Sequence, residues 1–180
     1  MIRSALLILC VVACGGTKAT GTVADRPFSG NQAWARFSDR ELQLSIEENT
    51  NRCQSGKATG AANRYRLIAR LSKWDGSAII PASGPGVYTV LPKYCRDNAG
   101  KLFSDCSVSA KEAPTGSLYA IAEYERDGEQ TALAVLSGSV TVSDITPAKP
   151  GSIDGSFSVF VDPDSKLSGN FSSVICDVSE

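Results

Sequence analysis

The strongest constraint on the fold is an alternation of apolar and polar side chains that recurs along most of the chain. Over residues 42–46, apolar residues alternate with glutamine and serine, and the same period returns at 65–71 and 118–124. Successive side chains of a strand point to opposite faces of its sheet, so this period predicts half-buried β-strands. No long window shows the spacing of an amphipathic helix.

We therefore expect one all-β domain, an antiparallel β-sandwich or a closed barrel of about 8–10 strands with a meander at its C-terminal end. Turns are expected at Asp127-Gly128 and at Asp162-Pro163, where proline suits the second position of a tight turn. Alternation and turn residues together place the strands at residues 21–28, 32–38, 41–47, 64–73, 86–91, 117–126, 131–143, 152–161 and 166–176.

The last third of the chain repeats a pattern in which a glycine and its two polar neighbours are flanked by large apolar residues. It occurs at residues 136–140, 153–157 and 167–171. Glycine inside a strand usually marks a bend or the close approach of another backbone. The pattern therefore favours a coiled meander that folds over a core, rather than a glycine-lined ligand groove.

Composition excludes several classes of function. The 180-residue chain has no histidine, and its 18 Lys and Arg residues nearly balance 19 Asp and Glu. Without histidine, neither Ser-His-Asp nor Cys-His catalysis can be built, nor a His-ligated zinc site. The balanced charge argues against nucleic acid as a partner, because such proteins normally carry a basic excess. The length fits a single domain.

The N-terminus has the pattern of an export signal. Arg3 precedes an uncharged apolar stretch, residues 5–13, that is too short to span a bilayer. Residues 11–13, Val-Val-Ala, then precede Cys14, and this run resembles the lipobox of bacterial lipoproteins. Cys10 is the poorer lipid acceptor because a leucine precedes it.

The resemblance implies a lipid-anchored protein. The signal peptide, residues 1–13, would be cleaved, and Cys14 would carry the acyl chains that hold the protein on the membrane. Residues 14–20 would form a lipidated tether, and residues 21–180 the domain. Gly15, in place of an aspartate, implies localisation to the outer membrane. An ordinary cleaved signal with an incidental cysteine is the alternative.

The other four cysteines are expected to form two disulfides, as is usual in exported proteins. Cys95 and Cys106 flank a segment that can reverse the chain, which favours a local bridge and leaves Cys53 to pair with Cys176. Strict alternation puts Cys176 on a polar face, so either a bulge near Ser172 shifts the register or the bridge lies at the rim. No C-x₂-C pair supports a Cys₄ metal site, and we expect neither a metal nor a cofactor.

Carboxylate pairs are the remaining candidates for catalysis. Glu123 and Glu125 share one strand face, but Tyr124 between them lies on the apolar face, so both glutamates are expected to face solvent. Asp162 and Asp164 lie in a turn and lack the ligand run of an EF-hand. Solvated carboxylates are weak catalysts, so we expect no enzymatic activity.

Aromatic residues at strand ends are candidates for binding. Trp34, Trp74 and Tyr94 could stack on a sugar or dock a partner. The alternative is that these rings are packed at strand ends as parts of the fold.

A second resemblance concerns the exported part of the chain. Residues 85–90, PGVYTV, together with the glycine-containing strands and the final cysteine, resemble small uncharacterised β-rich bacterial lipoproteins, a family with no assigned activity. We expect an envelope protein with a non-catalytic β domain that is structural or binds a protein or glycan. The alternatives are a carrier of small apolar ligands with a calycin-like cavity, or an inhibitor of an exported hydrolase with a protruding 95–106 loop.

Overall fold

The computed structural model of the chain describes residues 16–48, 65–91, 114–126, 133–148 and 150–176. Within these residues, strands account for 74% and helices for 0%, so the all-β prediction is confirmed. The described part of the chain contains no helix long and apolar enough to cross a membrane.

The described strands belong to one sheet. Their bounds are β1 (Lys18–Val23), β2 (Arg26–Gly30), β3 (Gln32–Phe37), β4 (Leu42–Glu47), β5 (Tyr65–Trp74), β6 (Ile79–Pro81), β7 (Gly86–Val90), β8 (Leu118–Arg126), β9 (Leu133–Ala134), β10 (Ser137–Thr146), β11 (Gly151–Asp162) and β12 (Ser165–Cys176).

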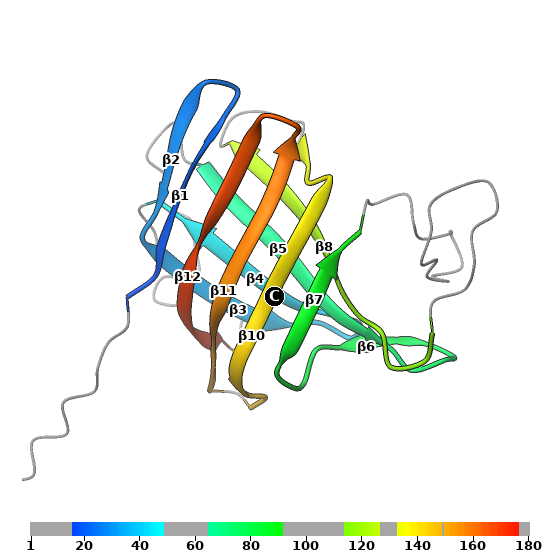
Figure 1. The fold of residues 1–180 in the computed structure, drawn as a ribbon. Helices are drawn as coiled ribbons and strands as arrows, with labels where there is room; N and C mark the ends of the chain where they lie inside the picture. The colour runs from blue at the N-terminus through cyan, green and yellow to red at the C-terminus, as the bar shows by residue number, and fades with distance from the viewer. Residues whose placement is uncertain (1–15, 49–64, 92–113, 127–132, 149, 177–180) are drawn as a thin grey trace, which may run out of the picture.

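Eight of these strands close into a barrel. Their order is β11-β10-β7-β8-β5-β4-β3-β12, and the ring closes because β12 also pairs with β11. In Figure 1, a front wall of β12, β11, β10 and β7 lies over a rear wall of β3, β4, β5 and β8. The predicted meander is β10-β11-β12. The expectation of a wholly antiparallel sheet is wrong, because β12–β3 and β7–β8 are parallel.

A hairpin stands where one strand was expected over residues 21–28. β1 and β2 pair along their whole length, and Ala24 and Asp25 between them have φ of 48° and 61°. Both residues thus adopt the left-handed geometry of a type I′ turn without the usual glycine, and Asp25 is the one turn-favouring residue of the pair. β1 pairs with β12 over residues 167–170, whereas β3 pairs with residues 174–176 of the same strand.

The strand expected over residues 131–143 is divided in the structure. β9 pairs with β8, whereas β10 leaves that neighbour and pairs with β7 and β11. The short β6, which pairs with β5, was not anticipated. The turn predicted at Asp127-Gly128 lies outside the described residues.

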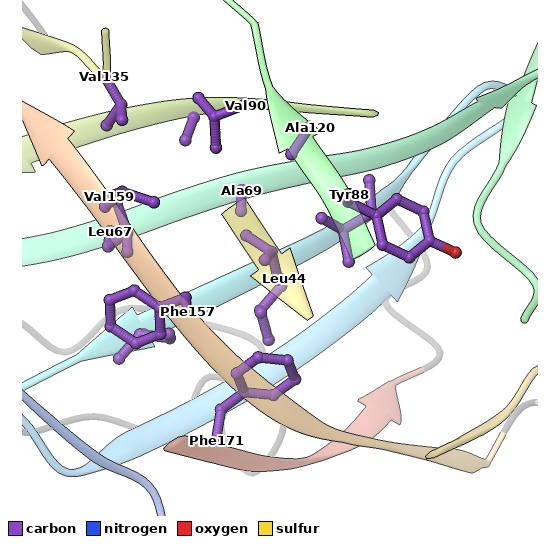
Figure 2. Close-up of a cluster of buried hydrophobic side chains, with 14 of the residues drawn as sticks. Leu44, Leu67, Ala69, Tyr88, Val90, Ala120, Val135, Phe157, Val159 and Phe171 are labelled. Atoms are coloured by element: carbon purple, nitrogen blue, oxygen red, sulfur yellow. The ribbon is translucent and has the colours of Figure 1, made fainter. Parts of the chain in front are cut away.

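The inward-facing side chains form one hydrophobic cluster that includes all eight barrel strands. The rear wall contributes many alanines, and aromatic rings of the front wall fill the space above them. Figure 2 shows Phe157 and Phe171 reaching from the front wall toward the wall that carries Leu44 and Ala69. An eight-stranded barrel is about wide enough for side chains to fill. The buried alanines of the rear wall are Ala33, Ala35, Ala69, Ala120 and Ala122.

Two glycines make this packing fit. Gly155 lies opposite Phe171 in the β11–β12 register, and Gly169 lies opposite Phe157. A Cβ atom at Gly155 would lie 2.1 Å from the carbonyl oxygen of Thr141 and 2.6 Å from the Phe171 ring, and one at Gly169 would lie 2.1 Å from the carbonyl oxygen of Lys18. The interpretation of these glycines as sites of close approach is confirmed, since Gly155 leaves room for β10 and the Phe171 ring, and Gly169 leaves room for the backbone of β1.

Replacing one of these glycines should destabilise the barrel. Gly155→Ala is expected to lower the free energy of unfolding by about 1–3 kcal/mol, because the new methyl group forces the Phe171 ring or the backbone to move. Gly84→Ala is the matched control, since nothing lies within 4 Å of its Cβ position. Denaturant unfolding of both variants measures the difference, and equal losses would contradict the packing argument.

Candidate functional site

The carboxylates expected in solvent are held by arginines instead. Glu123 is only 6% exposed, and its Oε2 accepts a hydrogen bond from Nη1 of Arg70 at 2.7 Å. Arg66 pairs with Glu125, its register partner on the adjacent strand. The prediction that Glu123 is solvated is therefore wrong, because alternation shows which residues share a face but not whether that face is covered. Both carboxylates contribute to ion pairs that link β5 to β8.

The two predicted binding tryptophans are also buried. Trp34 is 4% exposed and donates its indole N–H to Oε1 of Glu47 at 3.1 Å. Trp74 is 3% exposed and packs in a second hydrophobic cluster with Tyr119 and Ile121. Neither ring offers a face for a sugar, which corrects the expectation of exposed stacking residues. Tyr94 lies outside the described residues.

The ion pair between Arg70 and Glu123 should stabilise the fold more than the ion pair between Arg70 and Glu41. Glu123→Ala is expected to lower the free energy of unfolding by about 1–3 kcal/mol, since it leaves part of a charged network without its partner. Glu41, whose Oε1 is 3.3 Å from Nε of Arg70, is more exposed, so Glu41→Ala should cost less than about 1 kcal/mol. Denaturant unfolding compares the two variants, and the reverse order would refute this ranking.

Hydroxyl side chains cover the outer face of the front wall and of the β1–β2 hairpin. We call this surface the hydroxyl face. Its side chains are exposed or half-buried, and cross-strand pairs of this kind stabilise a sheet. One row crosses six strands in register and consists of Ser29, Thr20, Ser168, Ser158, Ser139 and Thr89.

An apolar hollow lies at one end of the barrel, where β10 begins and β11 ends. It measures about 310 Å³ and is lined by Leu136, Ser137, Phe160, Asp162 and Pro163. Leu136 is 46% exposed and Phe160 is 36% exposed. The backbone N–H of Leu136 donates to the backbone carbonyl of Phe160, so the two residues are neighbours. Grouped exposed apolar side chains are typical of interaction surfaces.

The turn at the rim of this hollow has the predicted form. Asp162 and Ser165 are register partners, so Pro163 takes the second position of the turn. The N–H of Asp164 donates to Oδ1 of Asp162 at 2.9 Å. The Ser165 hydroxyl and this N–H hold the pKa of Asp162 below its usual value. The charged form is therefore favoured at the rim of the hollow.

The opposite end of the barrel is closed by Tyr88. Its hydroxyl donates to the carbonyl of Gly84 at 2.7 Å, and burial raises the pKa of the phenol. A second hollow of about 270 Å³ lies outside this ring, and Lys73 and Leu118 are among its lining residues. Because the Tyr88 side chain is itself fully buried, the ring separates this hollow from the interior of the barrel.

The chain is attached to the barrel earlier than expected. β1 begins at Lys18, and the Thr17 hydroxyl donates to the carbonyl of Ser172 at 3.1 Å and accepts from its N–H at 3.3 Å. The expected boundary, with a tether over residues 14–20, is therefore wrong, because ordered structure begins before residue 21. Cys14 lies outside the described residues, and its lipidation stays a prediction.

Cys176 ends β12. The β11–β12 register continues unshifted from Lys166 to Ile175, so no bulge lies near Ser172 and the half-buried Cys176 is at the rim of the barrel. Its predicted partner, Cys53, lies outside the described residues. The same holds for the predicted pair of Cys95 and Cys106.

Metal-ligand groups and similarity to known proteins also bear on function. Among the residues that the structure describes, no group of three or more His, Cys, Asp and Glu side chains could hold a metal ion. Comparison of the chain with protein-family models, curated proteins and solved structures finds no match.

Proposed function

We propose that this protein is a lipid-anchored protein of the bacterial outer membrane whose barrel is a non-catalytic module that binds another protein. The observation that carries the proposal is the apolar hollow at the end of the barrel. Leu136 and Phe160 expose large apolar side chains there. An exposed apolar surface of this kind is stabilised when a partner covers it.

The filled interior favours surface binding over transport of a small ligand. A carrier would need an apolar cavity within the ring, but the alanines of one wall are covered by aromatic rings of the other. A ligand could enter only by displacing those rings, which would cost packing energy. For this reason we favour surface binding as the function over transport by a calycin-like carrier.

The absence of catalysis is supported by the chemistry of the side chains. The sequence has no histidine, and Glu123 and Glu125 are engaged by arginines rather than poised for proton transfer. Asp162 is kept in its charged form by turn hydrogen bonds, so it is a poor general acid at neutral pH. The inhibitor alternative depends on the 95–106 loop, which lies outside the described residues.

A glycan is the second candidate partner, and the hydroxyl face favours it. Its rows of serine, threonine and asparagine side chains offer donors and acceptors like those of sugar hydroxyl groups. These rows carry few charges, and hydroxyl pairs between strands also occur simply to stabilise a sheet. The apolar hollow is therefore the stronger observation.

The lipid anchor depends on one residue. Cys14→Ser should abolish incorporation of labelled fatty acid and block processing of the signal at this position, because the serine hydroxyl cannot replace the thiol. Cys10→Ser is the matched control and should be labelled normally. Labelling that persists in the Cys14 variant would contradict the assignment.

The binding surface can be tested by placing a photo-crosslinking residue at Phe160 in intact cells. We expect one discrete crosslinked protein at this position and none at Val87, an exposed apolar residue on β7 that lies outside the hollow. Leu136→Asp should abolish the product from Phe160. Crosslinking at both positions, or at neither, would contradict the protein-binding proposal, and glycan binding that is lost in Ser158→Ala would favour the second candidate.

A further inference from the structure

We infer that the barrel lies directly against the bilayer, and that the surface around Thr17, formed by Lys18, Asn170, Ser172 and Val174, contacts the lipid headgroups. This inference rests on the proposed acylation of Cys14. It adds an orientation that the lipid anchor alone does not imply, since a long tether would leave the domain free to turn.

The tether is too short to hold the barrel away from the membrane. Only Gly15 and Gly16 lie between Cys14 and Thr17. An extended chain advances at most about 3.6 Å per residue, so the Cα atoms of Cys14 and Thr17 are within about 11 Å of each other. The polar layer of a bilayer leaflet is about 5–8 Å thick. Thr17 must therefore lie in this layer or immediately above it.

The tether cannot lengthen without breaking the fold. Thr17 is 8% exposed and is held to Ser172 by two hydrogen bonds. The next residues are paired with β12, with Lys18 opposite Asn170, and Ala19 is buried in the main core. Releasing more chain would break these pairs one after another. The attachment point is thus fixed on the outer surface of the barrel.

The chemistry of this surface suits lipid headgroups. Lys18 is exposed and can approach a phosphate, and Asn170 and Ser172 offer hydrogen-bond donors beside it. Val174 is 49% exposed on the same side of β12 and presents an apolar contact. Asp154, the register partner of Ser172, is the nearby acidic residue on the adjacent strand. The hydroxyl face that continues from here adds little charge.

The apolar hollow lies at the other end of β12 from the attachment point. From Ser172 to Ser165, β12 spans about 23 Å at about 3.3 Å per residue. The turn that follows Asp162 lies at that far end and forms the rim of the hollow. The attachment point and the hollow are therefore separate surfaces of the barrel.

The test uses the full lipidated chain, labelled with ¹⁵N, in nanodiscs that contain a gadolinium-chelating headgroup lipid. Amides of Lys18, Asn170 and Ser172 should relax several-fold faster than those of Asp25 and Asp164 at the far turns. The matched control inserts about twelve flexible Gly and Ser residues between Gly16 and Thr17, which span about 20 Å, and should remove most of the difference.

Each failure of this experiment has a different meaning. Uniform relaxation in the native chain, or faster relaxation at Asp25 and Asp164, would overturn the orientation while leaving the anchor intact. An insertion variant that relaxes like the native chain would also overturn it, because tether length would then not matter. A chain that carries no acyl group by mass spectrometry, and that leaves the nanodisc, would refute the lipid anchor and this inference together.

Discussion

The barrel depends on the fit between small side chains on one wall and aromatic rings on the other. The rear wall contributes five buried alanines beside its leucines, and Phe157 and Phe171 reach toward it from the front wall. Phe171 lies against Gly155 on the neighbouring strand, and Gly169 leaves room for the backbone of β1. The barrel can close tightly because a large side chain on one strand faces a glycine on the next.

This fit determines where the protein can interact with other molecules. With the interior occupied, recognition falls to the outer surface. The outer face of the rear wall is hardly exposed, since Trp34, Glu123 and Trp74 are all buried there. Among the described residues, the hydroxyl face of the front wall and the apolar hollow at the end of the barrel are open to solvent. The first suits hydrated headgroups or sugars, and the second suits a protein.

Much of the architecture could be predicted from the alternation of side chains. It gave the β class, most strand positions and the C-terminal meander, because the burial of one face is a local property of each strand. The role of Gly155 and Gly169 followed from their place between large apolar residues. Strand direction in the pairs β12–β3 and β7–β8 could not be predicted, because β7 and β12 alternate as antiparallel strands do, whereas parallel strands usually read as continuous apolar runs.

The functional surfaces were harder to predict for a related reason. Alternation assigned Glu123 to the outer face correctly but could not show that this face is covered. The Ala24-Asp25 turn lacks the glycine that usually signals a two-residue hairpin, and Asp25 alone is a weak turn signal. The apolar hollow brings Leu136 beside Phe160, and only the register of β10 and β11 shows that they are neighbours.

The central claim is that the barrel interior is filled and that binding occurs on the outside. Titration of the chain without its signal peptide and Cys14 (residues 15–180) with a fluorescent fatty acid distinguishes a filled interior from a ligand cavity. A filled interior predicts no saturable binding. Saturable binding with one ligand per chain, abolished by Ala69→Phe in a variant that still folds, would contradict the account and establish a carrier.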